Sequence, residues 1–197
     1  YMFDGATRFD SDIAAWNTNS VTSMAGMFNK AQAFNGDISG WDTSNVTEMH
    51  SMFAHAKTFS ADISSWDTSK VQDMTAMFDG ATDFDINLRT WNVGSLTKAN
   101  NIFDHSGLSP INYSSTLDGW VRSEKAPRNL TIGAEGVYWC PHPSFDEAKT
   151  LMNERGWVRN DAGAASEYQG PVISVVNKQD LDSEKKGPVT IVITTDE

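Results

Sequence analysis

The sequence has little of several features that define common protein classes. Cys140 is the single cysteine in 197 residues, which excludes an internal disulfide framework and a cysteine-based metal cluster. The sequence contains no apolar run of about 18 residues and therefore predicts no membrane-spanning helix. Its 15 Lys and Arg are outnumbered by 26 Asp and Glu, and this net charge of −11 argues against nucleic-acid binding, which needs a basic surface. Apolar residues still make up 39% of the chain, more than a disordered chain contains.

The residues in excess are Trp, Phe and Met, and they recur at intervals of 25 residues. The most regular columns are Trp16, Trp41, Trp66 and Trp91, then Phe3, Phe28, Phe53, Phe78 and Phe103, and then Phe9, Phe34, Phe59 and Phe84. The central copies read VTSMAGMFNKAQAFNGDISGWDTSN and VTEMHSMFAHAKTFSADISSWDTSK. A repeat of this length predicts a solenoid, in which each coil buries its apolar face against the next coil.

Each copy of the repeat has two halves with different expected structures. In the first half, a helical spacing is set by Val46, Met49, Met52, Phe53 and Ala56. It predicts a helix of about three turns with Asn45 as N-cap, whereas the second half is shorter and predicts a brief strand over 38–41 followed by a turn. We therefore expect residues 1–106 to form an α/β, right-handed leucine-rich-repeat solenoid with a short strand and a helix in every 25-residue coil. Because Tyr1 falls in the middle of an expected helix, we also expect further coils before it.

The repeat decays after residue 106, and a different pattern follows. Residues 107–168 predict an α+β capping unit that closes the open end of the stack. Its expected elements are a helix over 109–123 with Ser109 as N-cap, a strand over 129–133, a helix that Ser144 caps, and a strand over 157–159. Residues 169–197 contain two β-branched segments, each opened by Gly-Pro, and predict a β-hairpin-like start of a following all-β extracellular module.

The repeat pattern NVTxMxxMFxxAxxFNxDISxWDTS resembles that of the BspA-like leucine-rich-repeat surface proteins of bacteria. The copies over 21–95 match it well, the half copy over 1–20 also matches, and GLSPINYSSTLDGW resembles the segment that ends such arrays. The resemblance implies an extracellular surface protein with an adhesive or protein-binding role. It implies no catalytic residues, and it does not select one ligand.

Two columns of the repeat mix Asp with Asn. The first contains Asp12, Asp37, Asp62 and Asn87, and the second contains Asn17, Asp42, Asp67 and Asn92. Because Asn cannot ionise but can accept a hydrogen bond in a turn, the mixture favours a structural role in turns over catalysis. A second hypothesis is that the Asp ladder binds Ca²⁺, which prefers oxygen ligands of this kind. No other cofactor is predicted.

The histidines and the cysteine predict no metal site and no catalytic site. His55 and His105 share a column but stand two coils apart, about 10 Å, which is too far to share one ion. His142 follows Cys140 by two residues, but no third group orients it, so a buried structural thiol is favoured over a nucleophile–base pair. We therefore expect a protein that is not an enzyme.

The repeated apolar columns are expected to form the core, so only positions that vary between coils are free to recognise a ligand. On the strand side, the candidate ligand-binding residues are Ser39, Ser64, Arg89, Ser65 and Thr90. Together with the resemblance, they suggest a cell-surface, extracellular binding module of a large adhesin, flanked by further domains, that recognises a protein, peptide or glycan. One alternative is a rigid spacer or cap in a surface protein. Another is ice or lattice binding by the column Thr18, Thr43 and Thr68.

Overall fold

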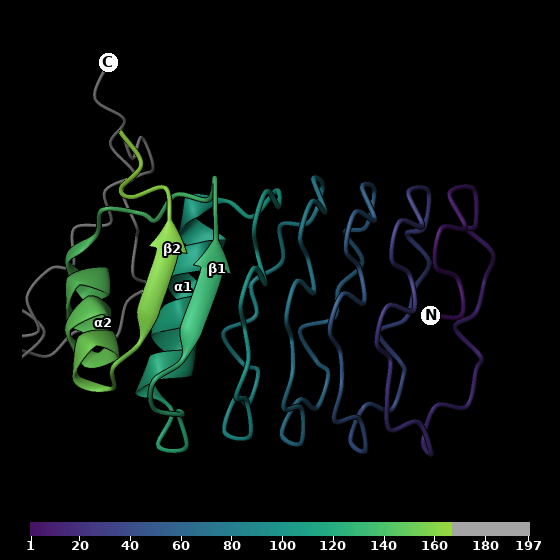
Figure 1. Ribbon diagram of the computed structural model, residues 1–197, viewed down its shortest axis with the longest axis horizontal. Coiled ribbons are helices and arrows are strands. Elements are labelled where there is room, and N and C mark those ends of the chain that lie inside the picture. The colour runs from purple at the N-terminus through teal and green to yellow at the C-terminus, as the bar shows by residue number, and fades with distance from the viewer. Residues whose placement is uncertain (167–197) are drawn as a thin grey trace, which may run out of the picture. The chain divides into compact units, whose positions relative to one another are not determined.

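A computed structural model describes residues 1–166. Residues 1–165 form one compact unit, in which the chain winds into narrow coils stacked one against the next (Figure 1). The coil that contains the N-terminus forms one end of the stack, and the helices and strands gather at the other end. The β module expected over 169–197 lies outside the described residues. Within residues 1–166, no helix is long and apolar enough to cross a bilayer.

Backbone hydrogen bonds join each coil to the next. Single parallel bridges connect Ser23 with Glu48, Glu48 with Asp73, and Asp73 with Lys98. Elsewhere in the coils the same relation recurs, for example from the Phe53 N–H to the Met77 carbonyl oxygen at 2.9 Å. The polar backbone groups of one coil are therefore satisfied by its neighbours, as the burial of the chain requires.

The helix and the strand expected in every coil are not observed among residues 1–106, which form turns joined by isolated bridges. The segment 46–56 contains two residues in the left-handed region, Ser51 with φ 53° and His55 with φ 56°. An α-helix cannot include such residues, because its i→i+4 hydrogen bonds need a continuous right-handed backbone. Residues 38–41 form a tight turn in which the Trp41 N–H donates to the Ile38 carbonyl oxygen at 3.1 Å. The right-handed leucine-rich-repeat class therefore stays a prediction.

The apolar columns are buried in the core, as the repeat predicts. The rings of Phe28, Phe53 and Phe78 stack almost parallel, with centroids 5.6 and 5.8 Å apart. Trp41, Trp66 and Trp91 are at most 4% exposed. Each indole N–H donates to the carbonyl oxygen of the residue 28 positions earlier in the sequence. Each coil thus contributes one layer to a continuous aromatic core.

The threonine column that motivates ice binding is also buried. Thr18, Thr43 and Thr68 are 6%, 2% and 0% exposed. Each hydroxyl donates to a carbonyl oxygen of the next coil, at 3.0 to 3.1 Å. These hydroxyl groups join one coil to the next and do not form an exposed binding row.

The capping region contains four elements: α1 (Pro110–Arg122), β1 (Thr131–Ala134), α2 (Pro143–Glu154) and β2 (Val158–Asp161). They match the expected order. Ser109 caps α1 as predicted, whereas α2 is capped by His142, whose side chain accepts from the Ser144 N–H. Pro143 follows His142 at the first helical position, where its missing N–H costs nothing, so the helix begins before Ser144.

The cap continues both the backbone ladder and the aromatic core. β1 pairs with β2 in parallel, and a bridge from Ala99 to Ile132 joins β1 to the last coil. Trp120 of α1 lies 6.0 Å from the Phe103 ring and donates its indole N–H to the Leu88 carbonyl oxygen at 2.9 Å. It thus makes the bond that the repeated tryptophans make, although it comes from a helix and falls outside the 25-residue spacing.

Candidate functional site

The predicted ligand-binding residues lie on a row of turns. In three successive coils, a side-chain oxygen at the start of the turn accepts the backbone N–H two residues later, belonging to Ser39, Ser64 and Arg89 at 3.0, 2.9 and 3.0 Å. The accepting residues are Asp37, Asp62 and Asn87. These contacts agree with the structural interpretation of this Asp/Asn column, and they orient the turns in the same way in each coil.

Hydrogen bonds between coils hold neighbouring turns together. The Thr90 hydroxyl donates to the Ser64 carbonyl oxygen at 2.9 Å, and the Ser65 hydroxyl donates to that of Ser39 at 3.5 Å. The structure therefore brings all five predicted residues together, on turns where a strand was expected. We call this surface the turn edge, defined as Ser39, Ser64, Ser65, Arg89 and Thr90 with the acceptors Asp37, Asp62 and Asn87.

The turn edge contains a hollow of about 380 Å³ lined by Asn35, Asp37, Ser39, Ala61 and Asp62. Hydrogen bonds from Ser39 hold the pKa of Asp37 below its usual value, and bonds from Ser64 do the same for Asp62. Both carboxylates are therefore ionised at neutral pH, and this hollow is negatively charged.

Arg89 introduces a positive charge at the other end of the turn edge. Its guanidinium lies 3.2 Å from the Asp118 carboxylate of α1, while 54% of its side chain stays exposed. Part of its charge is thus neutralised within the protein. The turn edge changes from acidic at Asp37 and Asp62 to mixed in charge at Arg89.

The second Asp/Asn column makes the same turn contacts. Asp42 and Asp67 accept the backbone N–H of Ser44 and Ser69 at 3.0 and 2.9 Å. Hydrogen bonds from these serines lower the pKa of both carboxyl groups. Since the oxygens already have partners in the turns, the contacts support the structural interpretation, and the Ca²⁺ hypothesis stays untested.

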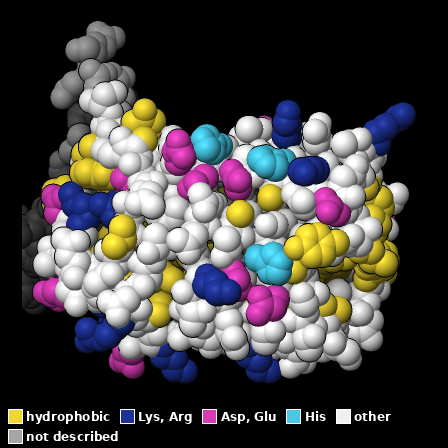
Figure 2. Space-filling model, in the orientation of Figure 1, with side chains coloured by type: hydrophobic (Ala, Val, Ile, Leu, Met, Phe, Trp, Pro, Cys, Tyr) yellow, Lys and Arg dark blue, Asp and Glu magenta, His cyan; other side chains and the backbone are white. Residues whose placement is uncertain are grey.

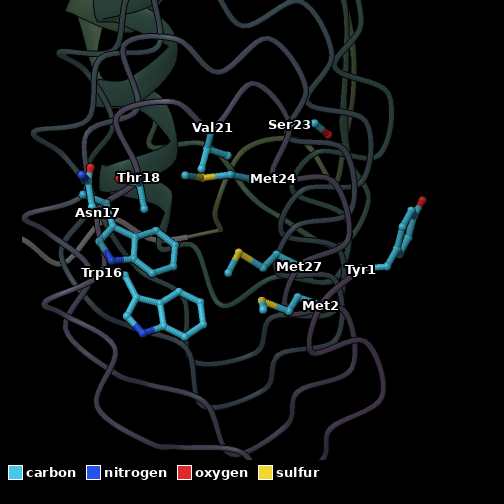
Figure 3. A pocket seen from close by; sticks show the side chains of 10 residues that line it. Tyr1, Met2, Trp16, Asn17, Thr18, Val21, Ser23, Met24 and Met27 are labelled. Carbon is cyan, nitrogen blue, oxygen red and sulfur yellow. The ribbon is translucent and has the colours of Figure 1, made fainter.

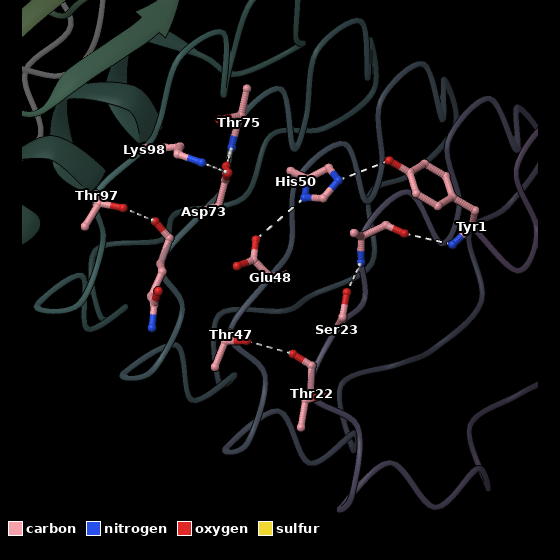
Figure 4. A network of polar contacts seen from close by, with 12 residues as sticks. Tyr1, Thr22, Ser23, Thr47, Glu48, His50, Asp73, Thr75, Thr97 and Lys98 are labelled. Atoms are coloured by element: carbon pink, nitrogen blue, oxygen red, sulfur yellow. Dashed lines mark hydrogen bonds and ion pairs between the residues drawn. The ribbon is translucent and has the colours of Figure 1, made fainter.

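A different surface runs along the bridges between coils. We call it the bridge face and define it by Ser23, Glu48, Asp73 and Lys98 with the side chains beside them. Figure 2 shows histidine, acidic and basic side chains scattered over this side of the coils. His50 Nδ1 lies 3.7 Å from a Glu48 carboxylate oxygen, and Lys98 Nζ lies 3.0 Å from Asp73 Oδ2 (Figure 4). One side-chain nitrogen of His50 and one carboxylate oxygen each of Glu48 and Asp73, atoms able to coordinate a metal ion, lie within 4.8 Å of one another.

The sequence alone does not reveal this group, because its members come from two coils and from columns that change residue type. Glu48 and Asp73 share a column with Ser23 and Lys98, and Thr75 takes the place of His50 in the next coil. A signal was present in the 25-residue spacing of the two carboxylates. It could be interpreted only once the bridges placed Glu48 beside Asp73.

The other histidines make separate contacts. His105 lies between Asp79 and Glu135, with nitrogen–oxygen distances of 3.6 and 3.9 Å. The His142 ring contacts the Ser144 hydroxyl at 2.7 Å, so it is engaged at the start of α2. Cys140 is buried, and burial raises the pKa of its thiol. Cys140 is therefore a protonated thiol at neutral pH, and His142, two residues later, is a helix cap.

A pocket of about 260 Å³ opens at the N-terminal end of the stack (Figure 3). Its lining is mostly apolar and consists of Tyr1, Met2, Trp16, Asn17, Thr18, Val21, Ser23, Met24, Met27 and Trp41. Trp16 stacks on Trp41 with centroids 6.3 Å apart, but it is 40% exposed whereas Trp41 is 4% exposed. Within residues 1–166, the Trp16 ring stacks on Trp41 on one of its faces, whereas Trp41 is buried among neighbouring coils.

Comparisons with known proteins identify a family for the repeat region. No curated protein and no solved structure matches the chain. A family model described as "Mycoplasma protein of unknown function, DUF285" matches residues 1–119, which is more than half of the sequence and covers all the coils and most of α1. The chain belongs to this DUF285 family.

Proposed function

We propose that this chain is a non-enzymatic binding module of a large cell-surface adhesin and that it recognises an extracellular partner through the turn edge. The observation that carries the proposal is the repeated turn, fixed by a side-chain oxygen in each coil and bonded to the next coil through Thr90 and Ser65. A ligand that contacts such a surface orders few groups on binding, so little affinity is lost to conformational entropy. The resemblance to BspA-like leucine-rich-repeat surface proteins supports the extracellular location and the leucine-rich-repeat class, which belong to the same proposal.

The charge of the turn edge favours one of the three partner classes. Among an extracellular protein, a peptide and a glycan, a protein segment with Lys or Arg side chains complements the hollow at Asp37 and Asp62 best. The net charge of −11 adds a general attraction for basic partners, which speeds their encounter with the protein at low salt.

The repeat itself supplies a matched variant for the test. Asn87 makes the same turn contact in its coil that Asp37 and Asp62 make in theirs. The double variant D37N/D62N should therefore keep both turns while removing two charges. We propose to measure binding of the wild type and this variant to arrays of basic, neutral and acidic peptides, extracellular matrix proteins and glycans.

The proposal expects saturable binding to basic peptides or to a matrix protein, weaker at higher salt and reduced about tenfold in D37N/D62N. A control variant on the second turn column, D42N, should bind as the wild type does, because Asp42 does not line the hollow. Absence of binding to every probe, or equal binding by wild type and D37N/D62N, would contradict recognition through the turn edge.

A second candidate function is a rigid spacer or cap within a surface protein. It is favoured by the continuous aromatic core and by the backbone hydrogen bonds that join each coil to the next. A spacer would resist extension in single-molecule force measurements, and surface substitutions such as D37N/D62N would leave attachment of whole cells unchanged. Reduced attachment in this variant separates the binding module from the spacer.

A further inference from the structure

We propose that Glu48, His50 and Asp73 form a binding site for a divalent transition-metal ion of the zinc class. The three side chains offer one imidazole nitrogen and two carboxylates, and their potential ligand atoms lie within 4.8 Å of one another. This inference does not depend on the turn edge or on an adhesive function, since it concerns a different surface of the coils.

The stacking of the coils brings the ligands together. Glu48 and Asp73 are direct partners in a parallel bridge, so their backbones lie one strand spacing apart, about 4.8 Å. His50 follows Glu48 by two residues, and its Nδ1 faces a Glu48 carboxylate oxygen at 3.7 Å. The site therefore needs two adjacent coils, and it exists only when they are in register.

Hydrogen bonds outside the three ligands orient two of them. The Thr75 N–H donates to Asp73 Oδ1 at 2.9 Å, and the other carboxylate oxygen, Oδ2, accepts from Lys98 Nζ. His50 Nε2 contacts the Tyr1 hydroxyl at 3.0 Å, so Nδ1 is the ring nitrogen left for an ion (Figure 4). A metal-binding histidine usually makes such a second hydrogen bond through its other nitrogen, which fixes the ring and its tautomer.

The distances suit an ion that draws the ligands slightly closer. Ligand atoms about 2.1 Å from a tetrahedral zinc ion lie about 3.4 Å from one another. The His50–Glu48 separation is already 3.7 Å, and 39% of the Glu48 side chain is exposed, so Glu48 can move toward an ion while Tyr1 holds the His50 ring in place. One nitrogen with two carboxylate oxygens favours a borderline ion such as Zn²⁺ over Ca²⁺, which prefers oxygen ligands alone.

Lys98 is the cation that an incoming metal ion would displace. Its ammonium lies 3.0 Å from Asp73 Oδ2. Lys98 thus shows that this carboxylate attracts positive charge, and it competes for the ligand atom. Replacing Lys98 by Met keeps the apolar stem and removes the competitor, so K98M should bind zinc more tightly than the wild type.

The test uses isothermal titration of the 197-residue chain with zinc chloride after removal of metals by a chelator. The repeat again supplies matched variants, because the neighbouring coils have Thr75 at the His50 position and Ser23 at the Glu48 position. H50T and E48S should therefore fold normally, which thermal melting in chelator checks. The control is H105A, because His105 also lies between two carboxylates, at 3.6 and 3.9 Å, outside the proposed site.

We expect one zinc ion per chain, affinity reduced about tenfold or more in H50T and E48S, no change in H105A, and tighter binding in K98M. In the ¹H–¹⁵N spectrum of the histidine rings, the signals of His50 should shift at a lower zinc concentration than those of any other histidine. The proposal is overturned if the wild type binds zinc with a dissociation constant weaker than about 1 mM. It is also overturned if H50T binds as the wild type does, or if H105A loses as much affinity as H50T.

Discussion

Removing one ring from the aromatic core should destabilise the protein far more in the middle of the stack than at its N-terminal end. Phe53 is fully buried, and its ring lies 3.8 Å from Phe59, 5.6 Å from Phe28 and 5.8 Å from Phe78. Phe3 occupies the same column but is only partly buried, with Phe9 at 3.8 Å and Phe28 at 5.5 Å. The two positions share chemistry and register and differ in the number of coils that cover them.

The expected magnitudes follow from burial. Replacing a buried Phe by Ala lowers the free energy of unfolding by about 3–5 kcal/mol, and the three stacked neighbours place F53A near the upper end of that range. F3A loses contacts on one side only and removes a ring that is already partly in water, so about 1–2 kcal/mol is expected. F53L keeps most of the volume and should lose about 1–2 kcal/mol, less than F53A.

Guanidinium unfolding followed by tryptophan fluorescence measures these differences. The dependence of the free energy on denaturant concentration should stay similar in all variants, which checks that the folded and unfolded states are unchanged. A loss in F53A no larger than that in F3A would refute the reasoning, because it would mean that coils on both sides of Phe53 do not close around it.

Three further changes test other contacts. T68V, which copies the residue at Val93 in the next coil, removes a hydroxyl that bonds a carbonyl oxygen of that coil at 3.1 Å, so thermal melting should show a loss of about 1 kcal/mol. Hydrogen bonds from Ser39 lower the pKa of Asp37 in the folded state, so the ionised carboxylate stabilises the fold at pH values above its unfolded pKa of 3.8, and this stabilisation is lost as the pH falls through the folded pKa. On acidification, the free energy of unfolding should therefore fall more in the wild type than in D37N. Gly80 has φ 67°, and a side chain there would meet the His55 ring, so G80A should cost about 1–2 kcal/mol, and adding H55A should restore only the part due to the contact.

The 25-residue period was enough to predict the core but not the backbone that supports it. Val46, Met49, Met52, Phe53 and Ala56 all point inward, as a helical spacing requires. A chain of turns can place the same residues inward, and here Ser51 and His55 adopt left-handed conformations that no apolar pattern reveals. The choice between helix and turns depends on whether backbone groups bond within a coil or between coils, and this is a property of the stack.

The capping helices were predictable for the opposite reason, since their signals are local. Ser109 followed by Pro110 marks the start of α1 by side-chain chemistry alone, and Gly156 follows soon after the end of α2. The cap differs from the expectation by two residues at the start of α2, where His142 is the N-cap in place of Ser144 and accepts the Ser144 N–H. Local chemistry thus predicts which elements exist better than it predicts their first residue.

The turn edge could be predicted from the sequence, whereas the Glu48–His50–Asp73 group could not, and the repeat explains this difference. The turn edge repeats its chemistry in each coil, so Ser39, Ser64 and Arg89 are recognisable as equivalent positions even though the expected strand is absent. The Glu48–His50–Asp73 group is a local exception within columns that hold other residues elsewhere. A stack of coils satisfies its backbone and its core in every layer, so one pair of layers can change its surface residues without cost to the fold. Binding sites in such a protein are therefore expected where one coil has a residue type that the rest of its column lacks. Such a residue indicates a site only when it is considered together with the residue beside it in the next coil.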